Sequence, residues 1–331
     1  MRRAGSSLVV ALGSAFAACA SLNCSSQQEI DAVEDLVAIE PRRDLALARE
    51  PLFAKLGEGL SEADGFERLR AAFAARNPGY DLRWMPAARA IAPRASCAIA
   101  FVQAGESAGA IGARRSELRR GDVALLRAGE ELALESALDV LVFDVPEDLP
   151  RALPSFVRPD HDPRITDTPG GCAEELEAYR RILLTWRSEV GPYVFRALNA
   201  HRVRIFDSFT HYHPPHGGFD ELYLVQGVQP GAKLITSSRT ARIVEPDTLA
   251  ESELDSLLVE HELEVGDLVY LPRGTIHRGV GGVLTQVITV PGFRPGAEIG
   301  VDHFLAGLNR RFPQRAPLPL HAKGADAPMV K

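Results

Sequence analysis

The sequence predicts a mainly β protein built from two similar β-barrel domains with peripheral helices. Two observations support this fold class. From Cys97 onward, short apolar runs are bounded by glycine, proline and aspartate, which is the pattern of strands and turns. In addition, residues 117–129 and 262–274 form an internal repeat at an offset of 145, and the same offset brings Val145-Pro146 onto Val290-Pro291. A repeat that keeps its register through a glycine turn, a strand and a closing proline indicates a duplicated domain.

The composition is that of a folded soluble protein. The chain has 331 residues, long enough for two domains, with 46% hydrophobic and 24% charged residues. A formal net charge of -7 argues against a nucleic acid or an anionic membrane surface as partner, because such partners select basic patches. We therefore expect a small-molecule substrate or ligand. The sequence leaves open whether the chain forms a homodimer.

The N-terminus resembles an export signal. Arg2 and Arg3 precede an apolar stretch, residues 8–18, of signal-peptide length. Phe16-Ala17-Ala18-Cys19 resembles the bacterial lipoprotein cleavage box, in which Cys19 would carry the lipid. Lipidation and plain cleavage near Ala20 are the two alternatives, beside an ordinary buried helix. We expect an exported protein, either periplasmic or an outer-membrane lipoprotein in a bacterium and otherwise secreted, touching a membrane only through this anchor.

Composition shifts divide the chain into segments. The expected segments are a leader (1–19), a tether (20–48), a first barrel domain (49–150), a linker (151–172), a second barrel domain (173–312) and a tail (313–331). Apolar spacing predicts two short helices within 52–75 and an amphipathic helix within 172–190. Cys97 and Cys172 fall in opposite halves, so they form either an interdomain disulfide or two buried thiols.

Four side chains suited to one metal ion lie at the two ends of a run of strands in the second half. Side chains two apart share a face of a strand, so His211 and His213 are expected to point inward together with Val203 and Ile205. Glu221 opens the next strand, and His277 follows a Pro-Arg-Gly turn. Three nitrogen ligands and one oxygen ligand suit one divalent ion, Fe, Mn, Zn, Ni or Cu, with coordination positions left open.

These two segments resemble the two signature motifs of the cupin family. The second motif reads Gly266, five residues, Pro272, one residue, Gly274, two residues, His277. Gly281 stands in place of its closing asparagine. The resemblance implies two double-stranded β-helix barrels, the bicupin arrangement.

The first motif is longer than the family pattern, because seven residues separate His213 from Glu221. His216 is therefore an alternative ligand. We prefer His211 with His213, since a longer turn absorbs the insertion while strand parity keeps the pair together. His216 is then expected at the rim.

The N-terminal half lacks the chemistry of this site. All nine histidines lie from His161 onward, and at the offset of 145 Leu132 corresponds to His277 and Arg127 to Pro272. We expect a degenerate barrel that packs against the metal-bearing one and stabilises it.

The cupin resemblance implies enzymes such as oxygenases, isomerases and decarboxylases, and also binding proteins without catalysis. We expect a metal-dependent enzyme of the oxygenase type acting on a small organic substrate. Asp207, Tyr223 and Gln286 are its candidate pocket residues, and no catalytic residue is assigned. A metal-dependent isomerase or decarboxylase and a non-catalytic small-molecule-binding cupin are the alternatives. If the chain is exported unfolded, it acquires its ion where Zn(II) and Cu(II) outcompete Fe(II) by affinity.

Overall fold

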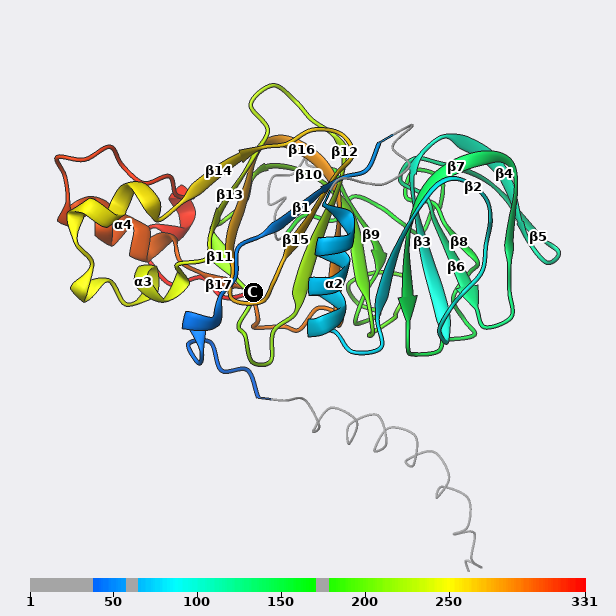
Figure 1. Ribbon diagram of the computed structural model, residues 1–331, viewed down its shortest axis with the longest axis horizontal. Helices are drawn as coiled ribbons and strands as arrows, with labels where there is room; N and C mark the ends of the chain where they lie inside the picture. Colours follow the sequence, from blue (N-terminus) through cyan, green and yellow to red (C-terminus); the bar gives the residue numbers. More distant parts are fainter. Residues whose placement is uncertain (1–37, 58–64, 171–178) are drawn as a thin grey trace, which may run out of the picture. The chain divides into compact units, whose positions relative to one another are not determined.

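The computed structural model describes residues 38–57, 65–170 and 179–331 (Figure 1). The expected leader with Cys19, most of the tether, and Cys172 lie outside these residues. Cys97 is buried and free. Among the described residues, no helix combines the length and apolar character needed to cross a bilayer.

The first sheet contains seven strands from the N-terminal half, and every pairing in it is antiparallel. Its strands follow one another at short spacing, as the glycine-bounded apolar runs predict. They are β2 (Asp81–Ile91), β3 (Cys97–Ala104), β4 (Glu106–Ile111), β5 (Arg114–Arg119), β6 (Val123–Arg127), β7 (Leu132–Val145) and β8 (Phe156–Val157).

The second sheet contains ten strands. All but one of them come from the C-terminal half. They are β1 (Leu52–Lys55), β9 (Arg180–Leu184), β10 (Asn199–Asp207), β11 (His211–Tyr212), β12 (Asp220–Gly227), β13 (Lys233–Ser237), β14 (Val259–Glu262), β15 (Asp267–Leu271), β16 (Ile276–Val290) and β17 (Ile299–Gly300).

The two sheets share one pairing scheme, which is the structural form of the sequence repeat. β7 pairs with β2, β3 and β4, and β16 pairs correspondingly with β10, β12 and β13. The edge partner of β6 is β8, and that of β15 is β1. The predicted fold class, mainly β with two barrel-like domains and peripheral helices, is confirmed.

Each sheet has an apolar inner face. Inside the second barrel lies a cluster that includes Val203, Ile205 and Tyr223. The first barrel is filled by its own apolar cluster, in which Leu132 is buried at the place that the repeat assigns to His277. The first barrel thus has hydrophobic packing at the position that corresponds to His277.

The outer faces of the two sheets pack against each other. Phe101 and Phe143 of the first sheet belong to the same buried cluster as Leu222, Tyr270 and Ile288 of the second. Polar contacts border this interface: the Gln103 side chain donates a 2.8 Å hydrogen bond to the Val225 carbonyl. The halves therefore share a hydrophobic core, as expected of a supporting domain.

One of the two helices predicted within 52–75 is wrong. Of the helix predicted within 172–190, residues 172–178 lie outside the described part of the chain and the rest is not helical. Within 52–75 only α2 (Phe66–Arg76) is helical, and Leu52–Lys55 forms β1, paired with β15 of the second sheet. The described part of 172–190 forms β9 instead of a helix. In short segments, apolar spacing fits both the helical period and the strand period. Pairing with the edge of an existing sheet favoured strands at these positions.

Helices gather where the C-terminal segment packs. The helices α3 (Thr240–Val244) and α4 (Asp302–Arg311) share a buried cluster with Leu249, Leu254 and Leu257 (Figure 1). Short 3₁₀ turns complete the element list: η1 (Leu45–Leu47), η2 (Pro246–Thr248), η3 (Glu251–Ser256) and η4 (Ala322–Gly324). The acidic, leucine-rich segment thus buries its leucines.

Candidate metal centre and adjoining cavity

Three histidines converge inside the second barrel. His211 in β11 pairs across the sheet with His277 in β16, and His213 follows two residues after His211. The ring centroids of His211 and His277 are 4.2 Å apart, and those of His213 and His277 are 5.0 Å apart. One nitrogen atom from each of the three lies within 4.8 Å of the other two. The strand parity that the sequence suggested thus brings the three rings together.

Backbone carbonyls fix the orientation of two of these rings. His211 Nδ1 lies 3.0 Å from the Phe209 carbonyl oxygen, and His277 Nδ1 lies 3.2 Å from that of Thr275. A carbonyl oxygen only accepts, so each Nδ1 carries the proton and donates it. Each Nε2 is then left with a lone pair, which is the form that binds a metal.

Burial keeps the imidazoles of His211 and His213 neutral. Burial, followed by the charge that His277 would carry if protonated, holds the pKa of His211 well below its usual value. The same two causes lower the pKa of His213. Within the described part of the chain, the Nε2 atoms of His211, His213 and His277 are buried without a hydrogen-bond partner. Unpaired buried acceptors of this kind call for a ligand.

Glu221 supplies a carboxylate at the same place. It lies in β12, its Oε1 is 3.3 Å from His277 Nε2, and its Oε2 is 3.8 Å from His213 Nε2. Oε1 is buried with no hydrogen bond to any described residue. Ligand atoms about 2 Å from one ion are separated by roughly 3–4 Å, so these spacings fit a common cation. The donor set of three nitrogens and one oxygen suits a divalent transition metal.

A buried ion pair next to the ligands connects their two strands. Asp220, at the start of β12, accepts hydrogen bonds from Arg273 N at 2.8 Å and Arg273 Nε at 2.9 Å. It also accepts from Tyr270 Oη at 2.8 Å and from Asn77 Nδ2 at 2.7 Å. Burial opposes the charge of Asp220, but Arg273 and Arg76 hold its pKa below the usual value. Asp220 thus fixes the turn before His277 relative to Glu221.

Two predicted pocket residues lie elsewhere. Asp207 is exposed at a β-bulge and pairs with Arg278 at 2.6 Å, because the bulge after Ile205 breaks the parity that we extended to it. Gln286 lies between the two barrels, where it donates to the Gly121 carbonyl at 2.8 Å and accepts from Gln226 at 3.0 Å. Neither side chain reaches the histidine cluster.

The remaining predicted residues lie near the cluster or at its edge. Tyr223 is fully buried on the inner face, with its ring centroid 6.3 Å from that of His277. His216 is partly exposed and faces Asp44, with His216 Nε2 3.5 Å from Asp44 Oδ2. It lies outside the histidine cluster, which leaves His211 as the partner of His213.

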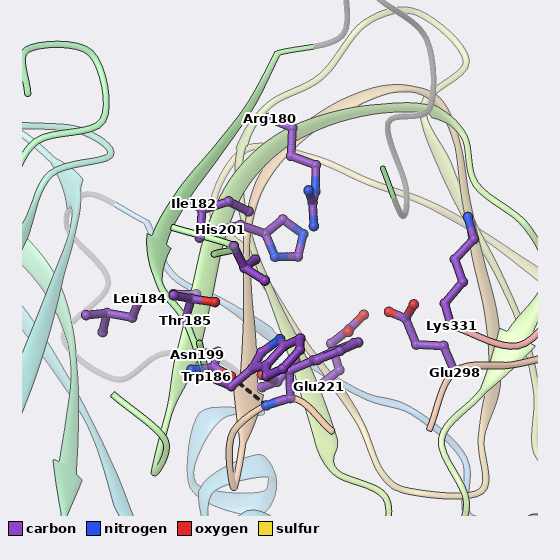
Figure 2. A pocket seen from close by; sticks show the side chains of 14 residues that line it. Arg180, Ile182, Leu184, Thr185, Trp186, Asn199, His201, Glu221, Glu298 and Lys331 are labelled. Atoms are coloured by element: carbon purple, nitrogen blue, oxygen red, sulfur yellow. Dashed lines mark hydrogen bonds between the residues drawn. The ribbon is translucent and has the colours of Figure 1, made fainter. Parts of the chain in front are cut away.

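A cavity of about 190 Å³ adjoins the cluster, and we call it the Glu221 cavity because Glu221 lines it (Figure 2). Arg180, His201, Glu298 and Lys331 also line it. None of these four residues was predicted as part of the site from the sequence. Strand parity could have found His201, which is two residues before the inward-facing Val203; Arg180 and Lys331 carried no local signal.

The two sheets have the double-barrel fold that the resemblance to cupins implies, and the candidate metal site lies in the C-terminal barrel. No protein-family model and no curated protein matches the sequence. Three solved structures illustrate the similarity of fold. They are oxalate decarboxylase from Bacillus subtilis (15% identity, 76% of this chain and 75% of that chain, TM-score 0.40), salicylate 1,2-dioxygenase from Pseudaminobacter salicylatoxidans (10%, 83% and 95%, 0.44) and 11S globulin from Wrightia tinctoria (10%, 84% and 94%, 0.46).

Proposed function

We propose that His211, His213, Glu221 and His277 hold one divalent metal ion, and that the protein is a metal-dependent enzyme of the oxygenase type acting on a small organic substrate. One observation carries this proposal. Three buried imidazole nitrogens and a buried carboxylate oxygen converge without other partners, beside a cavity that can admit a substrate. A bound ion would supply Lewis-acid or redox chemistry at its open positions.

The residues of the chain prepare the site in three ways. The carbonyls of Phe209 and Thr275 orient two imidazoles, so that their Nε2 atoms are aligned before any ion enters. The apolar inner face of the barrel, including Tyr223, excludes water around the ligands. The Glu221 cavity gives a substrate one route to the carboxylate side of the cluster.

The metal assignment is tested by removing single ligands. We expect H211A and H277A, purified from the native compartment, to lose stoichiometric metal in elemental analysis, because each removes one of four donors. H303A is the matched control, since the ring of His303 contacts that of Phe304 in α4, outside the cluster. Full metal content in either ligand variant would contradict the assignment.

The reaction type is tested with metal-loaded protein and candidate phenols, diketones and sugars. An oxygenase consumes dioxygen in step with substrate loss, so an oxygen electrode gives the readout. Turnover without oxygen uptake would indicate an isomerase or a decarboxylase. Tight binding without turnover would indicate a binding protein, and either result would overturn the oxygenase proposal.

Export of the chain, with Cys19 as a lipid attachment site or with plain cleavage of the leader, remains part of this proposal. It rests on the N-terminal pattern of arginines, apolar stretch and cysteine. Export in unfolded form favours zinc or copper over iron, because the ion is then acquired outside the cytosol, where these two ions outcompete Fe(II) by affinity. Elemental analysis of protein from its native compartment tests this preference directly.

A further inference from the structure

The ligands of the candidate metal centre differ in how they are held. Backbone carbonyls accept hydrogen bonds from Nδ1 of His211 and His277 and so orient both rings. Glu221 Oε1, by contrast, is buried and has no hydrogen-bond partner in the described part of the chain. Carboxylates that bind metal ions are normally hydrogen-bonded by neighbouring groups, so Glu221 calls for a donor.

Thr289 lies directly opposite Glu221 on the neighbouring strand. The two residues are partners in the antiparallel pair of β12 and β16, and both line the Glu221 cavity, so their side chains share one face of the sheet. Side chains opposite each other in such a pair have Cβ atoms about 4.5–5.5 Å apart. Thr289 is 5% exposed, and its Oγ1 is buried without a hydrogen-bond partner among the described residues. A donor and an acceptor that both lack partners therefore occupy adjacent positions.

The neighbouring positions leave this role to Thr289. On its other side Glu221 is paired with Leu271 of β15, whose side chain is apolar. Beyond Thr289, the partner on β10 is Asn199. Its side chain is already engaged, because Nδ2 donates to a backbone carbonyl at 2.6 Å and Oδ1 accepts from a backbone N–H at 2.7 Å. Of the two residues paired with Glu221, Thr289 is thus the one with a side-chain donor.

We propose that Thr289 is a positioning residue of the metal centre, whose hydroxyl donates a hydrogen bond to the Glu221 carboxylate when an ion is bound. A carboxylate has about four lone-pair sites, so it can bind a cation and still accept from a hydroxyl. Rotation about the side-chain bonds of Thr289 and Glu221 brings the two groups together without a change in the backbone. The hydrogen bond satisfies both buried atoms and holds the carboxylate toward the histidine cluster. This inference rests on the proposed metal site and adds a residue outside its ligand set.

Two substitutions separate the hydroxyl of Thr289 from its shape. T289V removes the hydroxyl and keeps the branched side chain, whereas T289S keeps the hydroxyl and removes the methyl group. In a competitive titration against a chromophoric chelator, we expect T289V to bind Zn(II) about 10- to 100-fold more weakly than wild type, because Glu221 has lost the group that orients it. T289S should stay within about threefold of wild type. The visible absorption spectrum of Co(II)-loaded protein should change in T289V and recover in T289S, because it reports ligand geometry.

Stability measurements distinguish positioning from packing. The Thr289 hydroxyl has no partner without an ion, so metal-free T289V should be at least as stable as metal-free wild type in urea unfolding. T285V is the matched control on the same strand, because Thr285 Oγ1 donates to the Leu224 carbonyl at 3.0 Å. It should lose stability and keep its Zn(II) affinity within about twofold of wild type.

Unchanged Zn(II) affinity in T289V, or a T289S variant that binds Zn(II) as weakly as T289V, would overturn the inference. T289A also removes the hydroxyl, and it gives the same comparison if T289V does not fold.

The two proposals can fail separately. Metal loss in H211A and H277A together with wild-type Zn(II) affinity in T289V supports the metal site and overturns the role of Thr289. Weak Zn(II) binding in T289V with recovery in T289S, but without oxygen uptake on any substrate, supports the role of Thr289 while the oxygenase proposal fails.

Discussion

At the scale of single residues, the site places neutral imidazoles beside a carboxylate. His211 and His213 are kept neutral by burial, while Glu221 presents a carboxylate to the same point. Burial and then the negative charge of Glu221 raise the pKa of Glu298, across the cavity, to about 7. An unpaired buried carboxylate is costly, so the cluster is most stable with a cation present.

Glu298 gives a prediction about pH. Its pKa is raised to about 7 in the folded protein, so the folded state binds this proton more tightly than the unfolded chain does. The resulting stabilisation is complete below the ordinary carboxyl pKa and is lost as the pH rises through about 7. We expect the free energy of unfolding of metal-free E298Q to fall less than that of wild type from about pH 5 to about pH 8, measured by urea unfolding.

Glu264 provides the comparison for that experiment. It is exposed, and its pKa is lowered by the hydrogen bond and charge of Lys55, so it titrates below this pH range. E264Q should therefore follow the wild-type slope. Identical slopes for E298Q and wild type would show that Glu298 does not hold its proton in the folded state.

At the scale of elements, β11, β12 and β16 position the site, and the turn before β16 sets the position of β16 relative to β12. Glu221 in β12 is paired with Leu271 of β15 and Thr289 of β16, so its position is fixed on both sides. The Pro272-Arg273-Gly274 turn leads into His277. Gly274 has a positive φ of 93°, and a Cβ at this position would lie 3.2 Å from the Cα of Ala48. Only glycine adopts this conformation without strain, which explains the motif.

The Asp220–Arg273 pair gives a second prediction, at the scale of this turn. D220N leaves the guanidinium groups of Arg273 and Arg76 without their buried counter-charge. We expect a loss of about 2–4 kcal/mol in the free energy of unfolding, since a broken buried pair costs about 3–5 kcal/mol and Arg273 is partly exposed. Metal affinity should fall roughly 10- to 100-fold, as for other groups that orient ligands.

Urea unfolding and a competitive metal titration measure both effects. D255N is the control, because Asp255 and Arg315 form an exposed ion pair. It should cost less than about 1 kcal/mol and leave metal affinity unchanged. Similar values for D220N and D255N would contradict the positioning role.

At the scale of the whole described molecule, the two halves stabilise each other through one shared core. Phe143 of the first sheet contacts Phe73 of α2 edge to face, with centroids 6.0 Å apart, and Phe73 in turn contacts Tyr270 of the second sheet at 5.9 Å. Strand β1 precedes the first sheet in sequence yet pairs with β15. The N-terminal barrel therefore stabilises the C-terminal barrel, which holds the histidine cluster.

This shared core predicts cooperative unfolding. The two tryptophans lie in opposite halves, Trp84 in β2 and Trp186 after β9. W84F leaves Trp186 as the fluorescence probe, and W186F leaves Trp84. In each variant we expect the urea midpoint from tryptophan fluorescence to equal the midpoint from circular dichroism. F143A should lower the free energy of unfolding by about 3–5 kcal/mol and shift both midpoints together to lower urea concentration. Two separate transitions would show that the halves are stable independently.

The sequence alone determined the duplicated β architecture, the inward pairing of His211 with His213, and the absence of histidines from the first half. The period of the apolar residues, the glycine turns and the constant offset of the repeat predict these features, because each depends on backbone geometry over a few residues. Only the tertiary structure decided that Asp207 and Gln286 face away from the site, that β1 joins the second sheet, and that Arg180, Glu298 and Lys331 meet at one cavity. A bulge changes strand parity, and pairing and closure of the sheet bring together residues far apart in the chain, so no local pattern contains that information.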